Sequence, residues 1–255
     1  MFINPVPQSA WDLKFRLFKV EARVHPSFWL GGLLFARNSG DVVYLAAGVA
    51  LLFVSILVHE MGHALAGRYY GDRLPTVSLY IMGGFYHAGS TRLQRGRFIW
   101  MCLCGPLAGF LLGAAAFGAL VAMWAGLIPK NELLDFVLIN AFYINAIWGL
   151  VNLLPVFPLD GGQIFREIVR WKFPRQGDAL CFTVSMAVGI AVAVIGLALN
   201  YLFNFGLFMA ILFGSMAWQN YQLRKIALLS RGNPEQEGEQ PRQAWERDAD
   251  WWKKG

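Results

Sequence analysis

Charged residues are scarce in this 255-residue chain, since only 15% of it is Asp, Glu, Lys or Arg while 56% is hydrophobic. A soluble globular domain has about 25% charged residues, so the composition argues against one and favours a membrane protein. Cysteine is also rare. Cys102, Cys104 and Cys181 lie within or beside apolar segments, and their spacing is typical neither of a disulfide framework nor of a zinc site. They are predicted to be small core residues.

The N-terminus lacks the charged start, short apolar stretch and small-residue cleavage site of a secretory signal peptide, so the apolar spans are expected to direct membrane insertion. The net charge is +6. The basic residues lie between the apolar runs, a pattern typical of topology signals, which argues against a nucleic-acid partner. No internal repeat or large soluble insert is present, and we expect one membrane domain over residues 1–225 and a polar cytoplasmic tail over residues 226–255.

Long apolar runs dominate the chain. The run that begins at Val42 continues without a breaker to Gly71, which exceeds the length of about 20 residues that a membrane crossing needs. Phe28 to Ala36 is a shorter candidate. Four further runs have a length near or above the requirement: Phe98 to Gly126, Leu133 to Leu154, Ala179 to Leu199 and Tyr201 to Trp218. The predicted fold class is an all-α polytopic membrane protein with about six transmembrane helices.

The distribution of basic residues predicts the orientation of these spans. If all six segments cross the lipid bilayer, 20 of the 22 Lys and Arg residues lie on one side, and only Arg37 and Lys130 lie on the other. Basic loops remain on the cytoplasmic side of a membrane. Both termini are therefore predicted to be cytoplasmic.

Two segments predict a small membrane-associated β element. Apolar and charged residues alternate over Leu13 to Val24, which favours a surface strand over a helix. Pro75 to Gly89 is rich in Thr, Val, Tyr and Phe around a pair of glycines, a composition typical of a hairpin or re-entrant loop.

The sequence His59-Glu60-Met61-Gly62-His63 stands near the end of the first long run. Two histidines four residues apart share one helix face and can hold a metal ion, with the glutamate close enough to polarise a metal-bound water. The motif follows Val42 by about 17 residues, or roughly 26 Å of helix, which places it in the membrane near the cytoplasmic face. Histidines satisfied by neighbouring groups are the alternative, but ionisable residues inside a span are usually functional. The pattern indicates peptide-bond hydrolysis within the bilayer.

A catalytic zinc ion usually has three protein ligands, so one more is needed. Asp160 is the candidate because the span before it returns to the cytoplasmic side, at the level of the histidines. By itself Asp160-Gly161-Gly162 is more typical of a turn, and the histidine pair is what favours a ligand. Asn152 is interpreted either as a buried hydrogen-bonding residue or as a group that orients the substrate carbonyl.

Other residues are assigned structural roles. His25 and His87 are expected to be interfacial or hydrogen-bonded histidines and not metal ligands. Gly105, Gly109 and Gly113 recur every four residues, which predicts a small-residue stripe that lets another helix approach closely. The helix with the histidine pair is the expected neighbour.

The order of the motifs resembles the signature of the site-2 protease family: His59-Glu60-Met61-Gly62-His63, Gly105-Pro106-Leu107, and Asn152-Leu-Leu-Pro155-Val-Phe-Pro158-Leu-Asp160-Gly161. The likeness covers about residues 15 to 225 and is nearest to minimal bacterial members without PDZ or CBS domains. It implies a six-helix zinc metalloendopeptidase that cuts the transmembrane segments of other membrane proteins, with Asp160 as the third metal ligand and Asn152 assisting. It also implies a bacterial inner membrane and regulation by a membrane partner.

Two other functions remain alternatives. A membrane metal transporter should place polar ligands along several helices, but no charged side chain lies between Ala179 and Trp218. A catalytically silent homologue would bind membrane proteins without cutting them, and the intact Glu60 argues against it.

Overall fold

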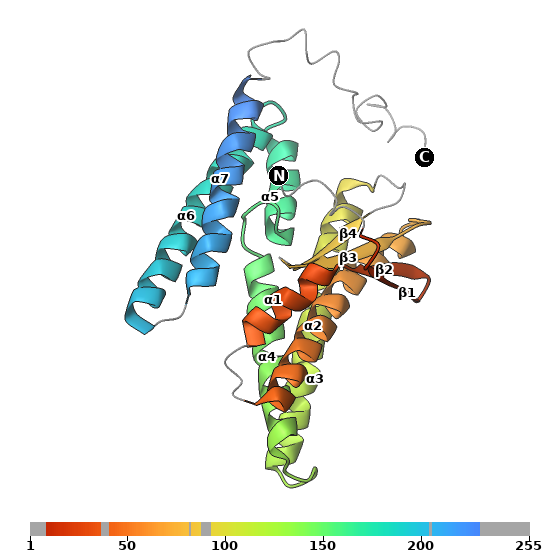
Figure 1. Ribbon diagram of the computed structural model, residues 1–255. Helices are drawn as coiled ribbons and strands as arrows, with labels where there is room; N and C mark the ends of the chain where they lie inside the picture. The colour runs from red at the N-terminus through yellow and green to blue at the C-terminus, as the bar shows by residue number, and fades with distance from the viewer. Residues whose placement is uncertain (1–8, 37–40, 82, 88–92, 204–205, 230–255) are drawn as a thin grey trace. The chain divides into compact units, whose positions relative to one another are not determined.

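The computed structural model describes residues 9–36, 41–81, 83–87, 93–203 and 206–229 (Figure 1). The chain divides into two compact units, Met1–Leu154 with Leu159–Ile164, and Pro155–Pro158 with Phe165–Gly255. The fold is mostly helical with one small sheet, as predicted. The elements of the described residues are, in chain order, β1 (Leu13–Leu17), β2 (Val20–Val24), α1 (Pro26–Ala36), α2 (Val42–Tyr69), β3 (Thr76–Tyr80), β4 (Gly83–His87), α3 (Arg95–Trp124), α4 (Glu132–Asn152), α5 (Asp160–Lys172), α6 (Gly177–Phe203) and α7 (Leu207–Leu229).

Four helices among the described residues are long and apolar enough to cross a membrane, namely α2, α3, α4 and α6. The protein is a multi-pass membrane protein. Two of the six predicted spans do not meet this criterion. Helix α1 has 11 residues, about half of what a crossing needs. Helix α7 has 23 residues, but Gln219, Asn220 and Arg224 make its second half polar.

The N-terminal segment predicted as one surface strand is in fact a β-hairpin. Leu13 of β1 lies opposite Val24 of β2, and Leu17 lies opposite Val20. Phe18 and Lys19 reverse the chain with positive φ angles of 47° and 62°. Non-glycine residues rarely adopt this conformation, so the sequence carries no turn signal at this point.

The second predicted β segment is confirmed as a hairpin. Strands β3 and β4 are antiparallel, and Tyr80 lies opposite Gly83. Strand β3 also pairs in parallel with β2, which joins the two hairpins into one sheet of order β1-β2-β3-β4. Strand β4 is therefore an edge strand.

Helix α2 is the centre of the first unit, because it contacts α1, α3, α4 and three of the strands. In Figure 1 the sheet lies beside the second half of this helix. One face of the sheet is apolar and packs against α2, which gives a core made of Val20, Ala22, Val24, Phe28, Leu52, Ile56, Leu57, Met61, Ala64, Val77 and Leu79. This packing brings the sheet to the helix that carries the histidine pair.

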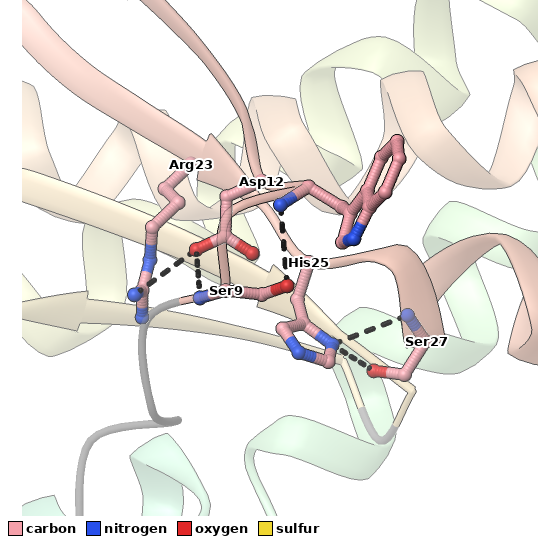
Figure 2. Close-up of polar contacts among 6 residues, drawn as sticks. Ser9, Asp12, Arg23, His25 and Ser27 are labelled. Atoms are coloured by element: carbon pink, nitrogen blue, oxygen red, sulfur yellow. Dashed lines mark hydrogen bonds and ion pairs between the residues drawn. The ribbon is translucent and has the colours of Figure 1, made fainter.

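Polar contacts fix the N-terminal segment and the start of α1 (Figure 2). Arg23 of β2 forms a buried ion pair of 3.3 Å with Asp12, which also accepts a hydrogen bond from the Ser9 backbone N–H. His25 Nδ1 lies 2.7 Å from Ser27 Oγ, and the Ser27 N–H donates to the same nitrogen. His25 is thus a hydrogen-bonded residue at the beginning of α1, as expected.

Candidate active site

Helix α2 places His59 and His63 one turn apart, with their Nε2 atoms 3.3 Å from each other. Asp41 begins the helix because its Oδ1 accepts a hydrogen bond of 2.7 Å from the Val43 N–H. The run between this cap and the histidines is apolar, so the pair lies deep along a spanning helix. Both imidazoles are buried, with exposures of 3% and 5%.

Asp160 joins the two histidines. It is the first residue of α5 and belongs to the same unit as α2. One carboxylate oxygen lies 3.2 Å from His59 Nε2 and the other lies 3.3 Å from His63 Nε2. A Cβ at Gly161 would overlap the backbone carbonyl of Leu153, so glycine allows the chain to return tightly after α4. Gly161, which by itself suggested a simple turn, therefore helps to place the Asp160 carboxylate beside the two histidines.

Helix α3 orients His63. The His63 Nδ1 lies 2.8 Å from the Met101 carbonyl, so this nitrogen carries the proton and donates it. Nε2 is then the ring nitrogen left to bind a metal ion, and it faces His59 and Asp160. A Cβ at Gly105 would overlap the His63 ring, and one at Gly62 would overlap the Cys104 carbonyl. Glycine on both helices is what allows this approach.

The predicted glycine stripe is only partly an α2 contact. Gly105 meets His63 of α2, as expected, but Gly109 and Gly113 face Asn145 of α4. The cause is geometric. Residues four apart move gradually around a helix, and α3 has a neighbouring helix on each side of the stripe. The Asn145 Nδ2 in turn donates a hydrogen bond of 3.0 Å to Ser55 Oγ of α2.

Strand β4 covers Glu60. A Cβ at Gly84 would overlap the Glu60 side chain, and the backbone N–H of Tyr86 donates to its carboxylate. Burial raises the pKa of Tyr80 in β3 to about 12, and the nearby Glu60 charge adds to this rise. A Cβ at Gly67 would overlap the Tyr86 hydroxyl, which donates a hydrogen bond of 2.6 Å to Asp72. The strand is thus attached along α2 beside the histidine pair.

The three donor groups fit a zinc ion. Zinc bonds of about 2.0–2.1 Å in a tetrahedral arrangement place neighbouring ligand atoms about 3.3 Å apart. The two imidazole Nε2 atoms lie 3.3 Å apart, and the two Asp160 oxygens lie 3.2 Å from His59 Nε2 and 3.3 Å from His63 Nε2. Burial by itself raises the pKa of Asp160, but the neighbouring His63 and His59 lower it to about 2. His59, His63 and Asp160 are the one group of this kind in the described part of the chain.

Residues 128–196 match the model described as Peptidase family M50. The chain is 32% identical over 156 residues to Rip3 of Mycobacterium tuberculosis, which covers 61% of this chain and 38% of that protein. It is 28% identical over 164 residues to a zinc metalloprotease of Methanocaldococcus jannaschii, with coverages of 62% and 45%. Over residues 128–196 the chain is similar to peptidase family M50. The chain spans less than half the length of the two relatives.

A solved structure shares the fold of this chain. The solved structure of a site-2 protease from Methanocaldococcus jannaschii matches with a TM-score of 0.57 and 22% identity. The match covers 84% of this chain and 95% of that one. At this identity the likeness shows a common fold, and the M50 matched range contains Asp160 but not the histidine pair.

The remaining predicted residues lie apart from the metal-binding atoms. Asn152 is buried, and its Nδ2 donates a hydrogen bond of 3.0 Å to the Trp148 carbonyl of its own helix. This contact is of the kind expected of a buried hydrogen-bonding residue. A role in orienting the substrate carbonyl stays a prediction. His87 lies in β4, where burial and the Arg23 charge lower its pKa.

The sequence did not reveal the groups that orient the site. The Met101 carbonyl is a backbone group without any side-chain signal, and Gly84 is one of many glycines in the chain. A weak signal existed for Tyr86, since the hydroxyl of a buried tyrosine usually has a hydrogen-bond partner. Its partner Asp72 precedes it by 14 positions and lies before β3, so the sequence does not show the pairing.

Gly105→Ala is expected to disturb the site while Gly118→Ala does not. The added methyl at Gly105 overlaps the His63 ring, whereas a Cβ at Gly118 in the same helix meets nothing within 4 Å. Changes to the residues that orient a metal ligand typically lower metal affinity by about 10- to 100-fold. Zinc content after dialysis against a chelator measures the effect. Equal zinc retention by the two variants would contradict it.

Asp160→Ala is expected to weaken metal binding as well as activity, because it removes one of three converging donors. Zinc per protein, measured on purified wild type and variant, gives the answer. Full occupancy in the variant would return Asp160 to the turn interpretation.

Proposed function

We propose that the chain is a zinc metalloendopeptidase that hydrolyses a peptide bond in or near a transmembrane segment of another membrane protein. The observation that carries the proposal is the convergence of His59, His63 and Asp160 within 3.2–3.3 Å, beside a buried glutamate, on a helix long enough to cross a membrane. The similarity of residues 128–196 to peptidase family M50 supports the same conclusion.

The residues of the site divide the chemistry between them. His59, His63 and Asp160 would hold the ion, and the Met101 carbonyl keeps His63 in the tautomer whose Nε2 is free to bind it. A bound zinc lowers the pKa of a water molecule and polarises the scissile carbonyl. Glu60 would take the proton of this water and deliver it to the leaving amine. Its carboxylate is next to the histidine pair but outside the group of donors, which suits a base.

The proposed substrate must unwind before it is cut. A transmembrane helix hides its peptide bonds in its own hydrogen bonds, and an extended segment needs new partners in the bilayer. Strand β4 is an edge of the sheet and lies against Glu60, so it could hold the extended segment by β-strand addition.

Cysteines placed in β4 are expected to crosslink to cysteines near the cut site of a coexpressed substrate. Cysteines placed in β1, the opposite edge strand of the sheet, provide the control. Crosslinks that form only at other regions would eliminate strand addition at β4.

We also propose a bacterial inner-membrane location with both termini cytoplasmic and a water path that opens on that side. The support is the distribution of basic residues together with the depth of His63 along α2. Cysteines introduced between Ala64 and Tyr70 should react with a membrane-impermeant reagent from the cytoplasmic side. Labelling from the outside alone would reverse the orientation.

Glu60→Gln is expected to abolish cleavage while zinc remains bound. The substitution keeps the size of the side chain and removes the base. General acid-base catalysis typically contributes about 10²- to 10⁴-fold to the rate, so the cleavage rate should fall by at least this factor. Zinc content and cleavage of a coexpressed membrane substrate are measured side by side on wild type and variant. The inactive variant is also expected to copurify with substrate.

Measurements on the wild type and on Glu60→Gln together separate the proposal from its alternatives. A wild type that moves metal into liposomes and cuts nothing would be a transporter, and one that binds without turnover would be a silent homologue. Wild-type cleavage by Glu60→Gln would disprove the assigned mechanism, and loss of zinc would make Glu60 a ligand.

A further inference from the structure

Two polar side chains of the second unit are completely buried although their helices are mainly apolar. Ser185 of α6 and Asn220 of α7 both have an exposure of 0%. Polar groups inside a membrane protein are costly unless they are hydrogen-bonded, and they are commonly functional. Neither residue is among those assigned to the site above.

Both side chains bind the backbone of one short segment, Pro155–Pro158. Ser185 Oγ accepts a hydrogen bond of 3.0 Å from the Phe157 N–H and donates one of 3.2 Å to the Pro155 carbonyl. Asn220 Nδ2 donates a hydrogen bond of 2.6 Å to the Phe157 carbonyl. Both backbone groups of Phe157 are therefore satisfied by side chains from two different helices.

The side chain of Phe157 is held as well. Its ring contacts Phe182 of α6 edge to face, with centroids 5.7 Å apart. The guanidinium of Arg166 lies 5.4 Å from the Phe157 centroid and is bound through Nε to Asp178 at 2.8 Å. Backbone and ring together immobilise this residue within its unit.

Phe157 precedes Asp160 by three residues, and one of the two between them is a proline. A proline fixes φ, so Pro158 removes one of the few backbone torsions that separate the anchored residue from the carboxylate. We propose that Ser185 and Asn220 are positioning residues for Asp160, which act through the backbone of Pro155–Pro158. The inference rests on the proposed function, in which Asp160 is a zinc ligand.

The experiment compares zinc affinity, by competition with a chelator, in wild type, Ser185→Ala and Asn220→Leu. Ser215→Ala and Asn140→Leu are the matched controls. The Ser215 hydroxyl donates to the Leu212 carbonyl and the Asn140 amide donates to the Phe136 carbonyl, each within its own helix. Groups that orient a metal ligand typically contribute about 10- to 100-fold to metal affinity. We expect this loss in the two site variants and unchanged affinity in the controls.

Ser185→Thr keeps the hydroxyl and is expected to retain wild-type zinc affinity, so the Thr and Ala variants decide the question even if Asn220→Leu does not fold. Thermal unfolding is recorded on the same samples. A lower melting temperature with wild-type zinc affinity would reduce both residues to packing groups and overturn the inference. A wild type that binds no zinc would instead overturn the proposed function, and the inference with it.

Discussion

The site depends on keeping four ionisable side chains buried among apolar helices. His59, Glu60, His63 and Asp160 are all less than 10% exposed. Removing such groups from water costs several kcal/mol for each unpaired charge, so the cluster is tolerable only if its members compensate one another. The imidazoles and the Asp160 carboxylate meet within hydrogen-bonding distance, and a metal ion would complete the compensation. Each member therefore depends on the presence of the others.

Close packing is what brings these groups together. A Cβ would overlap a neighbour at Gly62 and Gly105 between α2 and α3, at Gly84 above Glu60, and at Gly161 behind Asp160. Glycine at each contact lets backbones come near enough to place a carbonyl, a ring or a strand against the site. The same approach buries the four ionisable side chains, and a low local dielectric strengthens the electrostatic interactions among them.

In the second unit, buried polar side chains hold a backbone segment. Buried Ser185 and Asn220 hydrogen-bond to the segment that leads into Asp160, while Arg166 and Asp178 form an ion pair next to the Phe157 ring. Polar side chains commonly join helices in membrane proteins, where no water competes for their hydrogen bonds. In this chain they are directed at backbone, which suits a role in holding a loop.

The sequence by itself determined what depends on neighbouring residues. Long apolar runs predicted α2, α3, α4 and α6, since helix length and hydrophobicity are local properties, and the spacing of His59 and His63 predicted a shared face. The hairpin at Pro75–Gly89 followed from composition in the same way. The tertiary structure decided the reversal at Phe18 and Lys19, the parallel pairing of β2 with β3, and the covering of Glu60 by β4.

The meeting of Asp160 with His59, 101 residues away, combined both sources. Topology and the motif order suggested it, but only packing could decide the distances, because contacts between remote segments depend on how helices and glycines fit together and not on any local pattern. The same reason explains why the Met101 carbonyl, Ser185 and Asn220 carried no signal in the sequence. Their partners are backbone atoms, which every residue has and which only the folded chain brings to a particular side chain.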